Sequence, residues 1–276
     1  MHDLQWKPHL EHPPLRARYP RKICEALVTD GASARAAPVT TVRGTTIYAA
    51  HRVRRMLAPM MKRMRDLVLD QLARPHGWLG PLTGRILDRA NRRLNAQVID
   101  MLAVRPGERI LEIGFGGGGA LALLSARHPQ ARVAGVEIST SMLAAARRQF
   151  RGALSDGAME IQEASVERLP WPDQSFDGAY TINCIYFWPE PVVGLREIYR
   201  VLRPSGRLIL GVRAQATLRR AGFVDKGFHT PSYDDVATWL GRAGFREMRM
   251  IEDPPRHMAA ILAERPQPPA AEELPS

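Results

Sequence analysis

The glycine-rich segment at residues 114–119 is the part of the sequence whose residue types most clearly indicate chemistry. It follows a short apolar run and precedes residues with helical spacing, so we expect a strand, a tight turn and a helix. Glycine lets the backbone turn tightly and approach a ligand closely, and a helix start offers free N–H groups. The turn alone does not identify the ligand. Gly114, Gly116 and Gly119 fit the glycine pattern of dinucleotide-binding folds. Gly114, Gly116 and Gly118 equally fit the glycine pattern associated with S-adenosylmethionine.

Two acidic residues near this turn separate the alternatives. Glu112 lies two residues before the turn, where its carboxylate would attract the ammonium and sulfonium of S-adenosylmethionine and repel a pyrophosphate. Glu137 ends the next apolar run, where a carboxylate can accept hydrogen bonds from both ribose hydroxyls of either cofactor. The pair therefore favours the cationic cofactor.

The elements that must position these residues alternate between strands and helices. Apolar runs predict strands near residues 109–113, 132–137, 158–162, 177–182, 206–212, 246–251 and 257–263. Helical spacing predicts helices near residues 83–102, 117–127, 140–150, 190–202 and 232–243. Parallel neighbours need a crossover of about a dozen residues, so this alternation indicates an α/β protein with a mainly parallel, Rossmann-like sheet and helices on both faces.

Three further stretches give the sequence a family resemblance. They are the segments at residues 169–177, 180–183 and 197–208, and they add to the two segments at residues 110–119 and 133–139. With them the chain resembles the class I S-adenosylmethionine-dependent methyltransferases over about residues 83–265, particularly the small-molecule group that includes quinone C-methyltransferases and phospholipid N-methyltransferases. The resemblance implies a seven-stranded sheet of order 3-2-1-4-5-7-6 whose last strand is antiparallel, and S-adenosylmethionine as cofactor.

The same resemblance implies a set of cofactor-binding residues. Contacts to the methionine portion would come from Glu112, Gly114, Phe115, Gly116 and Gly118, and contacts to the ribose and adenine from Glu137, Ile138 and Met142. Where the family usually has an aspartate for the adenine amino group, this chain has Ser165 and Val166; the serine hydroxyl can still accept that bond but carries no charge. Asn183 would lie beside the transferring methyl group.

Catalysis by this class can rest on orientation alone, because the methyl donor is already activated. If a base exists, Tyr186 and His229 are the candidates, with an aromatic pocket cap and a loop histidine as their alternative roles. Cys184 follows Asn183 without the context of a nucleophilic cysteine, so we interpret it as a small pocket-lining residue. The two cysteines and scattered histidines predict neither a disulfide framework nor a metal site.

Composition divides the chain into four parts. The first part, residues 1–45, is rich in proline and arginine, which predicts a loosely structured extension. We expect a helical cap at residues 46–102, the cofactor-binding domain at residues 103–265 and a Pro/Ala/Glu tail at residues 266–276. Within the cap, residues 59–74 form a basic amphipathic pattern with an apolar stripe at Met60, Met61, Met64, Leu67, Val68 and Leu72. This stripe would either pack on the domain or lie on an anionic membrane surface.

The net charge of +11 belongs to the N-terminal third of the chain. Residues 1–94 hold 18 Lys and Arg against 7 Asp and Glu, whereas residues 95–276 hold 21 of each sign. A basic segment invites a nucleic-acid partner, for RNA modification or as a non-catalytic scaffold, but little aromatic interleaving and no recognised RNA-binding module disfavour it. We therefore expect methyl transfer to a small or lipid-like hydrophobic acceptor by a cytoplasmic protein without a signal peptide.

Overall fold

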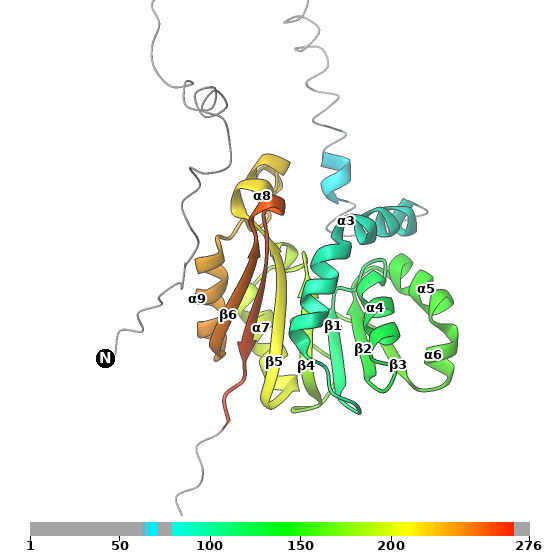
Figure 1. Ribbon diagram of the computed structural model, residues 1–276. Coiled ribbons are helices and arrows are strands. Elements are labelled where there is room, and N and C mark those ends of the chain that lie inside the picture. Colours follow the sequence, from blue (N-terminus) through cyan, green and yellow to red (C-terminus); the bar gives the residue numbers. More distant parts are fainter. Residues whose placement is uncertain (1–62, 64–65, 71–78, 268–276) are drawn as a thin grey trace, which may run out of the picture. The chain divides into compact units, whose positions relative to one another are not determined.

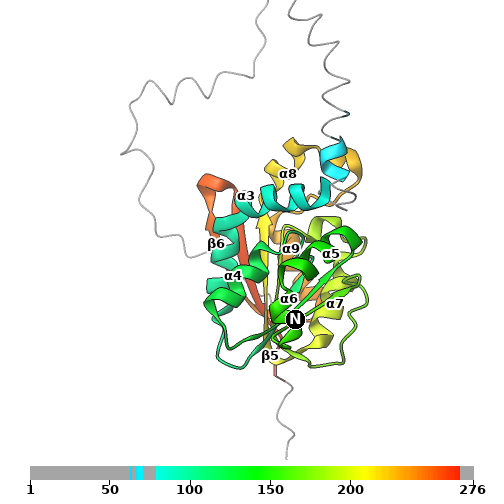
Figure 2. The same cartoon turned by 90° about the vertical axis from the view of Figure 1, so that its right-hand side faces the viewer.

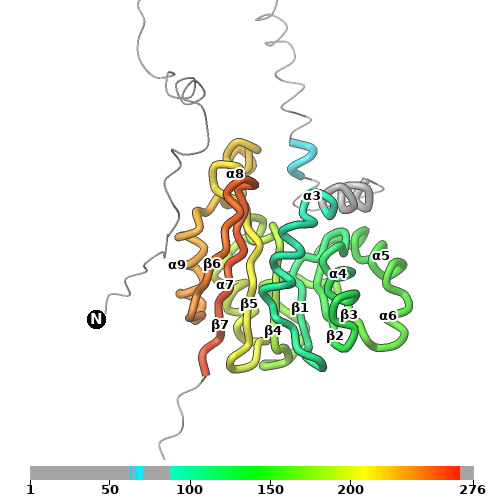
Figure 3. Tube along the Cα trace, viewed as in Figure 1, coloured from blue at the N-terminus to red at the C-terminus, as the bar shows by residue number. Residues whose placement is uncertain are grey.

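A single seven-stranded sheet forms the centre of the molecule (Figures 1 and 3). The computed structural model describes residues 63, 66–70 and 79–267. The strand order is β3-β2-β1-β4-β5-β7-β6, and β7 is antiparallel to both of its neighbours, as the sequence led us to expect. The strands are β1 (Arg109–Ile113), β2 (Arg132–Glu137), β3 (Met159–Glu163), β4 (Phe176–Ile182), β5 (Leu202–Arg213), β6 (Arg246–Asp253) and β7 (Met258–Glu264).

Helices cover both faces of the sheet (Figures 1 and 2). One face carries α3 (Leu79–Leu102), α4 (Gly119–Arg127) and α5 (Thr140–Gln149), followed by the short α6 (Arg151–Ser155). The other face carries α7 (Pro191–Val201) and α9 (Tyr233–Ala243). Between β5 and α9 the chain forms α8 (Gln215–Ala221) and the short 3-10 helix η4 (Val224–Lys226). The helices thus bury both faces of the sheet.

The central strands are apolar on both sides because both sheet faces are covered. In β1 only the first residue is partly exposed, and in β2 the five residues after Arg132 are buried. The two faces form two hydrophobic clusters, one containing Leu94, Val98 and Leu121 and the other containing Leu195 and Leu240. Since parallel strands end at one edge of the sheet, this packing fixes where the residues that follow β1, β2 and β4 meet.

Helix caps fix the positions of two helices. The hydroxyl of Ser139 accepts a hydrogen bond from the Met142 N–H at 3.3 Å, which starts α5 directly after β2. Ser232 and Asp235 form a reciprocal capping box at the start of α9, with N–H to oxygen distances of 3.1 and 2.8 Å. The first of these caps also fixes the loop that follows Glu137.

The predicted element boundaries agree closely with the structure, with a few differences. Strands β1 and β2 have the predicted bounds, and α3 begins earlier than predicted. Helices α6 and α8 were not predicted, because each is too short to show a helical period. Strand β5 begins at Leu202, where the sequence suggested the end of a helix. Within the described residues, no helix is long and apolar enough to cross a membrane.

A helical turn at residues 66–70 belongs to the predicted basic helix, and it corrects the predicted stripe. Leu69 is buried in the hydrophobic core, whereas Leu67 and Val68 are 65% and 56% exposed. Asp70 pairs with Lys226 of η4 at 2.9 Å, and the turn lies next to the segment that contains α8 and η4 (Figure 2). The other stripe residues, the arm at residues 1–45 and the tail beyond residue 267 lie outside the described residues.

Candidate functional site

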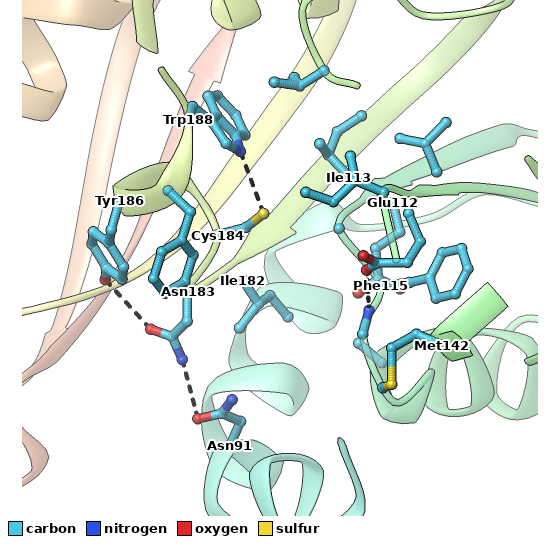
Figure 4. A pocket seen from close by; sticks show the side chains of 18 of the residues that line it. Asn91, Glu112, Ile113, Phe115, Met142, Ile182, Asn183, Cys184, Tyr186 and Trp188 are labelled. Carbon is cyan, nitrogen blue, oxygen red and sulfur yellow. Dashed lines mark hydrogen bonds between the residues drawn. The ribbon is translucent and has the colours of Figure 1, made fainter. Parts of the chain in front are cut away.

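A cavity of about 370 Å³ lies at the carboxyl ends of β1, β2, β4 and β5 (Figure 4). Two parts of its wall differ in chemistry. The acidic end consists of Asp88, Glu112 and Glu137 with the glycine loop at residues 114–117. The aromatic end consists of Asn91, Asn183, Tyr186, Phe187, Arg213 and Phe223. Figure 4 shows Glu112, Phe115 and Met142 on one side and Asn91, Asn183 and Tyr186 on the other.

Backbone geometry at the acidic end requires glycine at position 114. Gly114 has φ +69°, and an added Cβ would lie 2.4 Å from the Cys184 sulfur. Its N–H donates to the Val136 carbonyl at 2.8 Å, which ties the loop to β2. Gly116 and Phe115 line the cavity, but Gly118 does not: it packs against Phe150, and Gly117 lines the cavity instead.

Glu112 is a buried acid at the end of β1. Its side chain is 3% exposed and accepts a hydrogen bond from the Tyr180 hydroxyl at 2.8 Å. Burial raises its pKa to about 8, the hydrogen bond from Tyr180 opposes this, and the nearby charges of Asp88 and Glu137 raise it further. The carboxyl is therefore mostly protonated at neutral pH, and a cation bound beside it would favour its ionised form.

Glu137 closes β2 and is also buried. Burial raises its pKa, whereas hydrogen bonds from the N–H groups of Ser139 and Gly116 lower it. Both of these bonds are 2.9 Å long and use different carboxylate oxygens. The Ile138 N–H also bonds this carboxylate and lowers its pKa. Because a carboxylate has about four acceptor positions, it can still accept a further hydrogen bond from a ligand.

Asp88, which the sequence did not single out, brings a third acid to this end from helix α3. Its carboxyl accepts a hydrogen bond from the Gly119 N–H at the start of α4, and a Cβ at Gly119 would lie 2.6 Å from its Cγ. Burial raises its pKa to about 6, and the bond from Gly119 opposes this. The described residues hold no Lys or Arg in an ion pair with Asp88, Glu112 or Glu137.

Side chains after β2 and β3 line the cavity beside Glu137. Met142 is buried and Ile138 is 41% exposed, so Ile138 presents an apolar surface at the edge of the cavity. Ser165 and Val166 line it as well, and the Ser165 hydroxyl accepts a hydrogen bond from the Glu167 N–H at 3.3 Å. These are the residues that the family resemblance assigned to the adenine.

At the aromatic end, a hydrogen-bond network joins β4, β5 and α3. Asn183 follows β4 in a left-handed conformation, φ +55°, and its N–H donates to the Gly211 carbonyl at 2.8 Å. Its Nδ2 and the Nη2 of Arg213 both donate to the Asn91 Oδ1, at 3.1 and 2.8 Å. The Tyr186 hydroxyl donates to the Asn183 Oδ1 at 3.4 Å and accepts from the Arg213 N–H.

Aromatic rings give this end its apolar surface. Tyr186 and Phe187 each pack against Phe223, with ring centroids 5.8 and 5.5 Å apart. Phe228 supports Phe187 from behind at 5.0 Å, edge to face. With Leu218 and other apolar residues in the wall, this end offers a surface for a hydrophobic ligand.

The two candidate bases occupy different places. Tyr186 lines the cavity, but burial raises the pKa of its phenol well above the ordinary value, so its hydroxyl stays protonated. His229 is absent from the cavity wall formed by the described residues; its Nε2 lies 3.3 Å from the Pro189 carbonyl oxygen and its ring packs on Trp239. Burial raises the pKa of the Cys184 thiol to about 12, which agrees with a structural, pocket-lining residue.

Sequence reasoning missed the residues that α3 and β5 contribute. Asp88 and Asn91 lie one helical turn apart on α3, and Arg213 ends β5. None belongs to a motif, so only the spacing of Asp88 and Asn91 on one helical face could have pointed to them. No group of His, Cys, Asp or Glu in the described part of the chain is arranged to hold a metal ion.

Known proteins share this architecture. A family profile described as a methyltransferase domain matches residues 111–210. The 27-O-demethylrifamycin SV methyltransferase of Amycolatopsis mediterranei (strain S699) is 34% identical over 60% of this chain and 64% of its own. The 24-methylenesterol C-methyltransferase 2 of Oryza sativa subsp. japonica is 28% identical over 62% of this chain and 50% of its own. The crystal structure of the [4+2]-cyclase SpnF superposes on this structure with a TM-score of 0.57 and 20% sequence identity. The match covers 65% of this chain and 82% of the cyclase.

The profile match identifies residues 111–210 as a methyltransferase domain, and the sheet order and the glycine loop agree with the class I S-adenosylmethionine-dependent methyltransferases. This confirms the resemblance inferred from the sequence, and S-adenosylmethionine is the cofactor of the class. The chain spans about half the length of several curated relatives that it matches. The likeness to SpnF shows the fold alone.

Proposed function

We propose that the protein transfers a methyl group from S-adenosylmethionine to a small hydrophobic acceptor. The observation that carries the proposal is the acidic end of the cavity, where three buried or half-buried carboxyls surround a glycine loop without a cationic partner among the described residues. Such a site fits a ligand that carries an ammonium and a sulfonium, and it disfavours a pyrophosphate.

Individual residues have distinct roles in this proposal. Glu112 and Asp88 would hold the ammonium of the cofactor, and Glu137 would accept hydrogen bonds from its ribose. Ile138, Met142, Ser165 and Val166 would enclose its adenine. When bound, the cofactor supplies a methyl group that its sulfonium has already activated.

The remaining task of the protein is orientation. Asn183 is fixed by three hydrogen-bonding partners, Gly211, Asn91 and Tyr186, and Arg213 in turn donates to Asn91. This rigid wall would hold an acceptor against the glycine loop, and the aromatic rings would exclude water. Well-oriented reactants can account for about 7 to 11 kcal/mol of barrier lowering, so the geometry itself can supply most of the catalysis.

A direct test compares two variants that lose the same charge. Glu137→Gln should weaken binding of S-adenosylhomocysteine by about 10-fold to 100-fold, because a charge-assisted bond is worth roughly 1.5–3 kcal/mol. Glu252→Gln, on the exposed face of β6 and outside the cavity wall, should leave the affinity unchanged. Isothermal titration measures both, and an absence of S-adenosylhomocysteine binding to the folded wild-type chain would refute the proposal.

We extend the proposal to the N-terminal part of the chain in one respect. Helix α3 supplies Asp88, Asn91 and Asn95 to the cavity wall, which supports a role for residues 46–102 as a cap of the site. A second role that we propose for residues 59–74 is contact with an anionic membrane surface. The exposed side chains of Leu67 and Val68 support this role. Co-sedimentation with anionic and with neutral vesicles tests this second role. An absence of binding to the anionic vesicles would exclude it.

A further inference from the structure

We infer that the methyl acceptor is an anion at the moment of binding, held by Arg213: a hydrophobic molecule whose reactive end carries an acidic oxygen, such as a carboxylate, an acidic phenol or an enolate. This inference rests on the proposed function and specifies its substrate class. Four observations about the aromatic end of the cavity support it.

The first observation is the charge of the wall. Asp88, Glu112 and Glu137 at the acidic end and Arg213 at the aromatic end are the charged residues among the described residues that line the cavity. Arg213 thus provides the positive charge in the described part of the wall, and it forms no ion pair with any of the three acids. This separation of charge suits a cation at one end and an anion at the other.

The second observation is that Arg213 has spare donors. Its side chain donates to the Asn91 Oδ1 at 2.8 Å, and in the described part of the chain it forms no ion pair. A guanidinium has five N–H groups arranged in a planar fork that matches a carboxylate. A charge beside apolar walls and without a counter-ion is costly, and an anionic ligand would remove that cost.

The third observation is the position of Arg213 relative to the expected reaction centre. Arg213 and Asn183 donate to the same oxygen of Asn91, so the guanidinium lies next to the residue proposed to flank the methyl group. The backbone N–H of Arg213 also donates to the Tyr186 hydroxyl, which fixes the end of β5. The arginine is therefore held at the reactive end of the acceptor rather than at a distant part of it.

The fourth observation concerns proton removal. The wall of the aromatic end, as far as the structure describes it, holds no histidine, and the Tyr186 phenol stays protonated. A neutral alcohol or a protonated amine would require a base at this place. An oxygen that has already lost its proton to solvent requires none, and a neighbouring guanidinium lowers the pKa of that oxygen.

The test is a binding experiment with four naphthalene probes of matched shape. In isothermal titration with S-adenosylhomocysteine present, 2-naphthoate should bind more tightly than its methyl ester, naphthalene-2-methanol and 2-(aminomethyl)naphthalene. Arg213→Gln should weaken 2-naphthoate binding by about 10-fold to 100-fold, as expected for a charge-assisted pair, and leave the alcohol unchanged. Arg213→Lys should retain part of the affinity, since it keeps the charge but loses the fork.

The matched control is Arg219→Gln, an equal loss of charge on the exposed face of α8, which should leave every affinity unchanged. Unaltered S-adenosylhomocysteine binding by Arg213→Gln shows that the variant is folded; if it is not folded, the wild-type preference for 2-naphthoate over its methyl ester decides alone. Equal affinities, a preference for the amine or no binding of the acid overturns the inference. Failure of S-adenosylhomocysteine to bind, with the acid still preferred, refutes the proposed function instead.

Discussion

The two ends of the cavity are built in opposite ways. The acidic end combines a glycine loop, backbone N–H groups and carboxyls, and most of it comes from contiguous segments after β1 and β2. The aromatic end is assembled from side chains of α3, β4, β5 and the α8 region that are far apart in the sequence. Under the proposed function, the first end binds the shared cofactor and the second determines the individual acceptor.

The largest effect is expected from breaking the backbone of the acidic end. Gly114→Ala places a Cβ within 2.4 Å of the Cys184 sulfur at a φ of +69°. We expect a loss of roughly 1–3 kcal/mol of stability from overpacking, together with loss of S-adenosylhomocysteine binding. Thermal unfolding and titration measure the two effects.

Gly152→Ala is the control for this change, because Gly152 lies in α6 with nothing within 4 Å of an added Cβ. It should leave binding unchanged. If Gly114→Ala behaves like Gly152→Ala, the close approach of the loop to Cys184 has no functional importance.

The pH dependence of cofactor binding tests the buried acid at the same end. Glu112, with a pKa of about 8, is mostly protonated below that pH, and a bound ammonium favours its ionised form. Binding of the cofactor should therefore release protons. The affinity for the cofactor should rise as the pH is increased toward about 8, by at most about tenfold per pH unit, and then level off. Titrations in buffers of different ionisation enthalpy measure the proton release.

Glu112→Gln should remove both effects, which provides the control. In the free protein, Glu112 binds more protons folded than unfolded between its ordinary pKa of 4.5 and about 8, so its contribution to stability falls as pH rises through this window. The variant should lose that slope. A wild-type affinity that is flat across this range would contradict the proposed role of Glu112.

A smaller effect is expected at the aromatic end from Tyr186→Phe. The change removes the hydroxyl between the Asn183 Oδ1 and the Arg213 N–H, and an unsatisfied buried donor costs roughly 1–3 kcal/mol of stability. Turnover should fall modestly with an unchanged pH profile, because this phenol does not ionise near neutrality. Loss of a limb of the pH–rate profile would instead assign Tyr186 as a base.

The smallest effect is expected from His229→Gln. His229 packs on Trp239 outside the cavity wall, and its backbone N–H, which bonds the Tyr186 carbonyl at 3.0 Å, is retained in the variant. Turnover and its pH profile should equal those of the wild type. A large fall in turnover with unchanged S-adenosylhomocysteine affinity would restore His229 as a candidate base.

The same contrast explains what the sequence could predict. The residues around Glu112 and Glu137 were found because strand, turn and helix follow one another locally, and their spacing alone predicts where the acids meet. Arg213, Asn91 and Asp88 were not found, because their meeting depends on how α3 packs across the sheet. The exposure of Leu67 and Val68 was missed for a related reason: periodicity predicts an apolar face but not its orientation against a partner.

Helix α3 also has a consequence for how the chain folds during synthesis. Leu94 and Val98 pack against Gly211 of β5, close enough that an added Cβ there would lie 3.2 and 3.0 Å from their side-chain carbons. The ribosome completes this helix long before it makes β5 and β7. The part of the apolar face of α3 that contacts these two strands therefore stays uncovered until they are translated, which exposes apolar surface on the nascent chain.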